Sequence, residues 1–164
     1  MKRHAFAVFL MSVILVGLLA ACSQKPATPE PPEILYGHDV CSRCGMQIDE
    51  ARFAAATLLT SGEYLKFDDI GEMLVYHMEH PVDQVNAWFV HDYETEDWLR
   101  GETAYYARSA ELKTPMGYGI VAFADQKDAE TFASEHGGQI FSLDELRADV
   151  HIQVHGSHPS QTTD

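Results

Sequence analysis

Two stretches of the chain repeat the same order of apolar and polar positions. In residues 65–80, and again in residues 121–136, an apolar run leads to an acidic residue and then to apolar positions spaced three and four apart. At one fixed offset between the two stretches, Phe67 matches Phe123. A short apolar run favours a strand, and three-to-four spacing is typical of an amphipathic helix. The pattern therefore predicts a strand–helix unit that occurs twice.

Each strand–helix pair is flanked by further apolar runs and turn signals. We expect strands at residues 52–59, 64–67, 85–90, 104–110, 119–124 and 139–143, and helices at residues 70–80 and 126–136. Asp68 or Asp69 can cap the first helix and Asp125 the second, because their side chains accept hydrogen bonds from free N–H groups. This order predicts an α+β fold of two similar small ββαβ units with mainly antiparallel sheets.

The N-terminal segment has the character of a processing signal. Lys2 and Arg3 precede an apolar stretch, residues 5–20, that is short for a membrane-spanning helix. The order Leu-Ala-Ala-Cys that ends at Cys22 resembles a bacterial lipobox, in which the cysteine is acylated and becomes the first mature residue. An ordinary secretory signal and a retained anchor helix are the alternatives. The Pro-rich segment after Cys22 is expected to form an extended tether.

These features divide the chain into five expected segments. They are a lipoprotein signal peptide at residues 1–21, the lipidated cysteine and tether at 22–35, a first ββαβ unit with the Cys/Met loop at 36–95, a second ββαβ unit at 96–148 and a polar tail at 149–164. The polarity of the tail predicts that ordered structure ends near Val150. The tail carries His151, His155 and His158, for which weak metal capture and no function are both open.

The net charge of the chain indicates which kinds of partner it can bind. The formal net charge is −14, and loss of Lys2 and Arg3 with the signal would bring it to about −16. A surface of this sign repels the phosphate backbone of nucleic acids. It attracts cations or a basic protein face, although solubility alone also explains an acidic surface.

Three sulfur atoms lie within the run Cys41-Ser42-Arg43-Cys44-Gly45-Met46. Because Gly45 disfavours a helix, we expect this run to form a loop before the first strand. Thiolate and thioether ligands suit Cu(I), and a site of two or three sulfur ligands leaves an open edge for transfer. Met116 lies in the corresponding loop of the second half. The sequence therefore predicts a soft-metal site with Cys44, Met46, Met116 and Cys41 as candidate ligands.

Other interpretations of the two cysteines stay open at this point. A thioredoxin-like redox site requires a helix directly after the motif, and Gly45-Met46 is a poor helix start. Structural zinc needs four ligands, and the sequence has no second Cys-x-x-Cys. A disulfide between Cys41 and Cys44 would close too small a loop to stabilise distant parts of the fold. Weaker candidates for metal contact are His91, Met73, Met78, His77 and His80.

Several motifs together resemble the NosL family. They are the lipobox, Cys41-x-x-Cys44-Gly-Met46, the run from Phe67 to Met73, His91-Asp92-Tyr93 with Trp98, and the run from Thr114 to Phe123. The resemblance covers roughly residues 36–147 and implies two ββαβ units similar to the fold of organomercurial lyase. It also implies Cu(I) binding, with Cys44 and Met46 as leading ligands and Met116 and Cys41 as further ones.

The resemblance implies a place in nitrous oxide reductase maturation as well. NosL-like proteins supply copper for the copper–sulfur centre of the reductase, so an ABC-type membrane assembly and the reductase itself are the expected partners. We expect a periplasm-facing, membrane-anchored lipoprotein that acts as a copper chaperone and not as an enzyme. Three rivals remain: a thiol–disulfide redox lipoprotein using Cys41 and Cys44, an organomercurial-lyase-like enzyme, and a metal-free scaffold lipoprotein with an acidic face.

Overall fold

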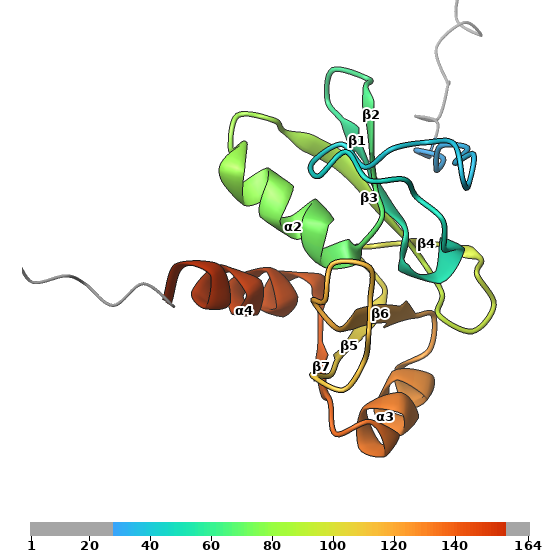
Figure 1. The fold of residues 1–164 in the computed structure, drawn as a ribbon, viewed down its shortest axis with the longest axis vertical. Helices are drawn as coiled ribbons and strands as arrows, with labels where there is room; N and C mark the ends of the chain where they lie inside the picture. Colours follow the sequence, from blue (N-terminus) through green and yellow to red (C-terminus); the bar gives the residue numbers. More distant parts are fainter. Residues whose placement is uncertain (1–27, 157–164) are drawn as a thin grey trace, which may run out of the picture.

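The computed structural model describes residues 28–156 and contains two antiparallel sheets (Figure 1). The first sheet has four strands in the order β2-β1-β3-β4, and the second has three strands in the order β6-β5-β7. The α-helices labelled α2, α3 and α4 pack against these sheets. Within the described residues, no helix combines the length and the apolar character that crossing a membrane requires.

The first unit contains the expected strands and helix together with two further short elements. In chain order they are η1 (Ala51–Phe53), β1 (Ala55–Leu59), β2 (Tyr64–Phe67), α2 (Ile70–Glu79), β3 (Val85–His91) and β4 (Trp98–Arg100). Ile70, Met73 and Leu74 are buried on α2. Because these residues are spaced three and four apart, one face of the helix supplies the apolar surface that covers the sheet.

The second unit repeats this order. Its elements are β5 (Tyr105–Arg108), β6 (Ile120–Phe123), α3 (Gln126–Glu135) and β7 (Gln139–Phe141), and the chain continues into α4 (Leu143–Gly156). In both units the first strand lies in the middle and pairs antiparallel with the strand before the helix and with the strand after it. The prediction of two similar ββαβ units is therefore confirmed.

Two short elements at the borders of the first unit differ from the expectation. The predicted strand at 52–59 begins only at Ala55, because Ala51–Phe53 forms a 3-10 turn. The strand β4 was not predicted, and its three residues pair with the end of β3. A strand of this length is too short to show an alternating pattern in the sequence.

The C-terminal helix α4 is a second difference. The sequence suggested a strand through residue 143 and loss of order near Val150, but α4 begins at Leu143 and continues to Gly156. Leu143, Leu146 and Val150 are buried, and this stripe anchors the helix to the core. A capping box starts it, because Glu145 accepts a hydrogen bond from the Ser142 backbone N–H at 2.8 Å.

Only one of the two predicted helix caps is present. Asp69 caps α2, since its side chain accepts a hydrogen bond from the Gly71 N–H at 2.7 Å. Asp125 occupies the same position before α3, but its side chain makes no capping hydrogen bond. The prediction of a cap is confirmed for the first helix and wrong for the second.

The apolar core is continuous across the two units. One cluster of buried residues includes Ile70 from α2, Tyr106 from β5 and Leu146 from α4. Helices α2 and α4 contact each other, and α2 also contacts β6. The N-terminal half of α2 therefore lies at the junction between the units (Figure 1).

The described part of the Pro-rich segment lies along the first sheet. Residues 28–31 and side chains of β3 and β4, among them Phe89 and Trp98, line one cavity of about 220 Å³. The Tyr64 hydroxyl donates a hydrogen bond to the Glu30 carbonyl at 2.8 Å. The chain is thus docked on the folded part from Thr28 onward.

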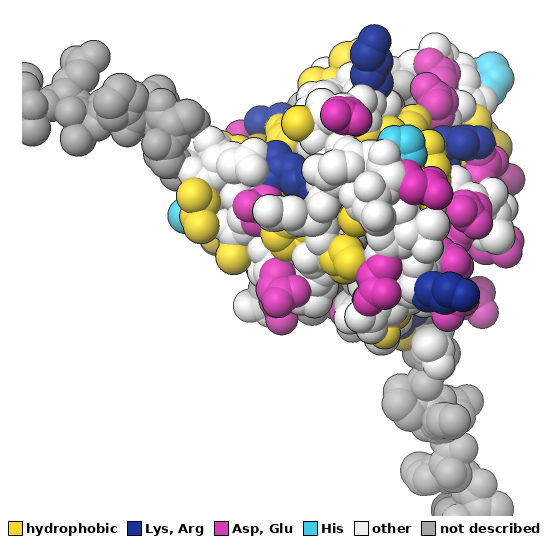
Figure 2. All heavy atoms as spheres, turned by 90° about the horizontal axis from the view of Figure 1, so that it is seen from below, with side chains coloured by type: hydrophobic (Ala, Val, Ile, Leu, Met, Phe, Trp, Pro, Cys, Tyr) yellow, Lys and Arg dark blue, Asp and Glu magenta, His cyan; other side chains and the backbone are white. Residues whose placement is uncertain are grey.

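Acidic side chains are more frequent than basic ones on one face of the molecule (Figure 2). Figure 2 shows this face, on which Asp and Glu side chains spread widely with fewer Lys and Arg side chains between them. This distribution agrees with the formal net charge of −14. A negatively charged surface of this kind repels the phosphates of nucleic acids.

Candidate metal site

The loop that carries the sulfur atoms folds into a tight turn. The Cys41 backbone N–H donates to the Met46 carbonyl at 2.7 Å, and the Gly45 N–H donates to the Cys41 carbonyl at 2.9 Å. Gly45 has a φ of +72°, in the left-handed region that a glycine adopts without strain. The loop therefore returns on itself and brings both cysteine side chains to one place.

Hydrogen bonds fasten this loop to the edge of the first sheet. The Ser42 backbone N–H donates to the Lys66 carbonyl at 2.7 Å, and the Lys66 N–H donates to the Ser42 hydroxyl at 3.0 Å. Because Lys66 belongs to the edge strand β2, the loop takes the place of a further strand partner at this point. The cysteines are thereby set beside the junction between β2 and α2.

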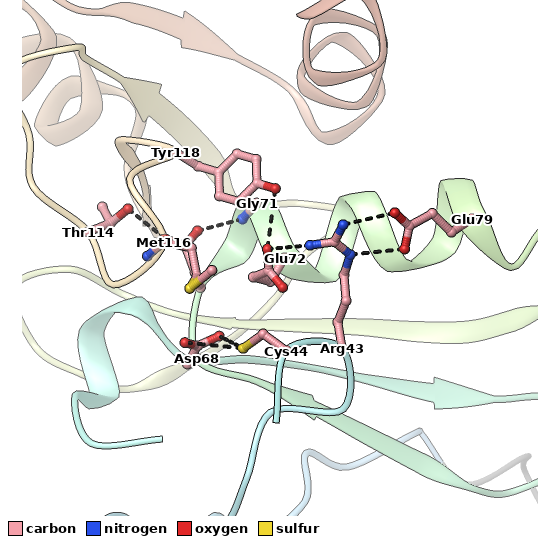
Figure 3. A network of polar contacts seen from close by, with 10 residues as sticks. Arg43, Cys44, Asp68, Gly71, Glu72, Glu79, Thr114, Met116 and Tyr118 are labelled. Atoms are coloured by element: carbon pink, nitrogen blue, oxygen red, sulfur yellow. Dashed lines mark hydrogen bonds and ion pairs between the residues drawn. The ribbon is translucent and has the colours of Figure 1, made fainter. Parts of the chain in front are cut away.

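Three potential ligand atoms converge at this junction. The sulfur atoms of Cys41 and Cys44 and a carboxylate oxygen of Asp68 all lie within 4.8 Å of one another. The Cys44 sulfur is 3.7 Å from Oδ1 and 3.8 Å from Oδ2 of Asp68 (Figure 3). Two thiols and one carboxylate form a donor set that fits a soft or borderline metal ion. Both cysteines are free thiols in this arrangement.

Asp68 was not predicted as a site residue. The sequence placed it among the possible caps of α2, but Asp69 makes the capping bond. Asp68 is left to face the cysteine loop, and its side chain is buried. The two consecutive acidic residues before the helix indicate that one of them is left for another role, because only one can cap the helix, but they do not indicate which one.

Burial distinguishes the two cysteines. Cys41 is 2% exposed, and burial raises the pKa of its thiol to about 12. Cys44 is partly exposed. A metal that binds Cys41 must therefore displace a proton from a buried thiol, while Cys44 is the more accessible of the two.

A loop from the second unit approaches the same junction. The Met116 backbone N–H donates to Oδ2 of Asp69 at 3.1 Å, so this loop is bonded to the residue that follows Asp68. In the view of Figure 3, the Met116 thioether extends toward the side on which Asp68 and Cys44 lie. The structure thus brings the predicted residue Met116 to the neighbourhood of the cysteine cluster.

The remaining residue of the motif, Met46, has an exposed side chain, unlike the two cysteines. Its side chain is 51% exposed, although its backbone carbonyl is bonded to Cys41. A thioether in this position is open to solvent and to an approaching partner. Cys22 and the signal segment lie outside the described residues.

Arg43 ties the cysteine loop to α2. Its guanidinium contacts Glu72 Oε1 at 2.6 Å and binds both carboxylate oxygens of Glu79, at 2.8 and 3.0 Å (Figure 3). These hydrogen bonds, first of all those to Glu79, raise the pKa of Arg43. Glu72 is fully buried and also accepts a hydrogen bond from the Tyr118 hydroxyl at 3.2 Å. The network joins the cysteine loop, the helix and the second unit.

The weaker sequence candidates have other roles. His91 is buried; its Nε2 lies 2.8 Å from the Tyr36 hydroxyl and its Nδ1 2.9 Å from the Glu96 carbonyl, so neither nitrogen is free for a metal. The Nε2 of His77 lies 3.0 Å from the Thr57 hydroxyl. Met73 is fully buried in the core. His158 and the side chain of His155 lie outside what the structure describes.

Comparison with known proteins places the chain among relatives that share its sequence pattern and fold. The family model described as NosL matches residues 32–151. A protein of Stutzerimonas stutzeri, the copper-binding lipoprotein NosL, is 26% identical over 148 residues, which span 84% of this chain and 78% of the relative.

A solved structure shows the same fold. The crystal structure of the copper chaperone NosL from Shewanella denitrificans matches with a TM-score of 0.62 at 23% identity, over 72% of this chain and 96% of that one. At this identity the match concerns the fold alone, whereas the family model covers most of the chain. The chain therefore belongs to the NosL family.

Proposed function

We propose that this chain is a lipoprotein that binds Cu(I) and delivers it for assembly of the copper–sulfur centre of nitrous oxide reductase. The observation that carries the proposal is the convergence of the Cys41 and Cys44 thiols with Asp68, within 4.8 Å, on a loop with one partly exposed thiol. Two thiolates hold a soft ion, and the open side allows a partner to take it by ligand exchange. The copper-binding and chaperone names of the two relatives support the same direction.

The proposed ligands differ in their role. Cys41 and Cys44 would hold the ion, and Met116 would add a thioether from the second unit. Met46, exposed beside the turn, would be the ligand that an incoming partner meets first. Loss of the two thiol protons on binding makes uptake of the metal dependent on pH.

The redox alternative receives less support. A catalytic Cys-x-x-Cys site needs a thiol with a lowered pKa, commonly at the N-terminus of a helix. Burial raises the pKa of Cys41 instead, and both cysteines lie in a loop that ends beside an edge strand. Among the described residues, the loop does not continue into a helix, so neither cysteine stands in the first turn of a helix, the position that a catalytic Cys-x-x-Cys commonly occupies.

The proposed location and partners follow from the same assignment. The cysteine at position 22 would carry the lipid, and the folded part would face the periplasm from the inner or the outer membrane. An ABC-type membrane assembly of the maturation machinery and the reductase itself are the proposed partners. The acidic surface favours a partner face of opposite charge.

A Cu(I) titration tests the proposal. The reduced soluble domain that starts after Cys22 is titrated against a chromophoric Cu(I) chelator, beside Cys44→Ser and the control Met78→Leu. Met78 lies on α2, about 12 Å along the helix from its start, so its thioether should not contribute.

We expect one equivalent to bind tightly to the wild type and to Met78→Leu. Cys44→Ser should bind at least about a hundredfold more weakly, because a direct ligand contributes more than the contacts that support it. Equal competition by the wild type and Cys44→Ser would reject the copper site. In that event the metal-free scaffold becomes the better account of the chain.

A further inference from the structure

We propose that Asp69 is a positioning residue that holds the Met116 loop against the cysteine cluster and thereby adds a thioether to the Cu(I) site. The inference rests on the proposed copper-binding function and concerns how its ligand set is assembled. It assigns a role to a buried carboxylate that helix capping does not fully account for.

Asp69 bonds to two parts of the chain that are distant in sequence. Its Oδ1 accepts from the Gly71 N–H at 2.7 Å, which is the cap of α2. Its Oδ2 accepts from the Thr114 hydroxyl at 2.6 Å and from the Met116 N–H at 3.1 Å. Asp69 is fully buried, so these three donors are not replaced by water.

The bonds of Asp69 fix the Met116 loop at more than one point. Thr114, which donates to Asp69, also accepts a hydrogen bond from the Gly119 N–H at 3.2 Å through the same hydroxyl oxygen. One carboxylate oxygen therefore holds the start of the loop, its methionine backbone and, through Thr114, its end. Such a loop presents the Met116 side chain in a restricted set of positions.

The neighbouring residue connects this loop to the metal site. Asp68 belongs to the cysteine cluster, and Asp69 follows it with extended backbone angles, φ −145° and ψ 139°. Side chains of consecutive extended residues point in opposite directions. The Asp68 carboxylate therefore lies beside the Cys44 sulfur, whereas the Asp69 carboxylate accepts its bonds from the Met116 loop. Figure 3 shows Asp68 with Cys44, and Met116 on the other side of this junction.

Comparison of the two repeated units indicates that Asp69 does more than cap its helix. Asp125 holds the same place before α3, and its side chain makes no capping bond. A helix of this fold therefore forms without an aspartate cap. The additional bonds of Asp69 to Thr114 and Met116 have no counterpart at Asp125 among the contacts of the described residues.

The test is a double-mutant cycle on the mature lipoprotein in detergent. Asp69→Asn, Met116→Leu and the double variant are compared with the wild type, with Asp125→Asn as matched control. Asparagine keeps the size of the side chain, but its amide NH₂ cannot accept the bonds that the second carboxylate oxygen receives. Cu(I) affinity is measured by chelator competition, and the number of sulfur neighbours of copper by X-ray absorption.

We expect Asp69→Asn and Met116→Leu each to weaken Cu(I) binding by about tenfold or more, the range found for contacts that support a metal ligand. Both should lose one sulfur neighbour of copper, and the double variant should be no weaker than Met116→Leu alone. Asp125→Asn should match the wild type. If Asp69→Asn weakens binding equally in the Met116→Leu background, it acts independently of Met116 and the proposal is overturned.

Two further outcomes separate this inference from the proposed function. If Cys44→Ser abolishes binding but Met116→Leu does not weaken it, the copper site stands and the positioning role falls. If Cys44→Ser leaves binding unchanged, the proposed function itself falls. Should Asp69→Asn fail to fold, Thr114→Val removes one bond to the same oxygen and must show the same dependence on Met116.

Discussion

The ring of Tyr118 lies where a side chain at position 71 would be. A Cβ atom added to Gly71 would stand 2.0 Å from Cγ and 2.4 Å from Cδ2 of Tyr118. The second unit therefore packs directly against the backbone of the first turn of α2, close to the cysteine cluster. Glycine is required at position 71 because any side chain there would overlap with the Tyr118 ring.

The first prediction concerns this contact. Gly71→Ala should destabilise the fold by about 1–3 kcal/mol, because the added methyl group must displace the Tyr118 ring. An alanine in a helix interior ordinarily stabilises by about 0.5–1 kcal/mol relative to glycine, so the expected sign is reversed. Urea unfolding followed by circular dichroism measures the change. Adding Tyr118→Ala to Gly71→Ala should cost less than the two single changes together, and strict additivity would contradict the contact.

The second prediction concerns Arg43, Glu72 and Glu79. Arg43→Met leaves the fully buried Glu72 carboxylate without its cation and should cost about 3 kcal/mol of unfolding free energy. Glu79→Gln removes the partly exposed partner of the same guanidinium and should cost less than about 1 kcal/mol. Denaturant unfolding of both variants gives the comparison. Combining Arg43→Met with Glu72→Gln should recover part of the loss, and equal costs for the two single variants would be inconsistent with a buried pair.

The third prediction separates the two thiols. Iodoacetamide at pH 8 should alkylate Cys44 at least about ten times faster than Cys41, because burial protects Cys41 and raises its pKa to about 12. Timed labelling and peptide mass spectrometry measure both rates. In denaturant the rates should become similar, since the burial is lost. Equal rates in the folded protein would show that Cys41 is accessible.

The fourth prediction is a pH dependence of stability that arises at His77. Burial lowers the pKa of His77 to about 4, while an unfolded histidine titrates near 6.5. Between these values the unfolded chain binds a proton that the folded chain does not, so stability is lost as the pH falls from about 6.5 to 4. Because the ring is partly exposed, we expect this contribution to be about 1–2 kcal/mol.

His77→Gln should reduce that loss, since glutamine can keep a hydrogen bond to Thr57 without titrating. Unfolding free energies at pH 7 and pH 4.5 give the difference for each variant. The control is His80→Gln at the exposed C-cap of the same helix, which should change the dependence much less than His77→Gln does. An unchanged dependence in His77→Gln would assign the acid sensitivity to other groups.

The repeated ββαβ order could be predicted because it depends on local patterns. Helix α2 shows its apolar stripe clearly, and β2 begins and ends where the turn signals place it. Helix α4 was missed because the exposed apolar residues Ile152 and Val154 blur the periodicity of its buried stripe. Its burial depends on contact with α2, which no local pattern reveals.

Part of the candidate site also depends on local patterns, and part depends on contacts between distant residues. The approach of Cys41 to Cys44 follows from their spacing and from the turn at Gly45, so it could be predicted locally. The contribution of Asp68 could not, because it depends on which of two adjacent aspartates caps the helix. The role of His91 depends on the hydroxyl of Tyr36, 55 positions away in the chain. Contacts of this range arise only in the folded protein.

The docking of the Pro-rich segment limits how far the folded part can lie from Cys22. With Thr28 already held on the sheet, residues 23–27 are the length available between the lipid proposed on Cys22 and the folded part. Fully extended, they span at most about 20 Å. The folded part, with its metal site, would then stay within about 20 Å plus its own width of the lipid headgroups. A partner anchored in the same membrane would meet it by lateral diffusion.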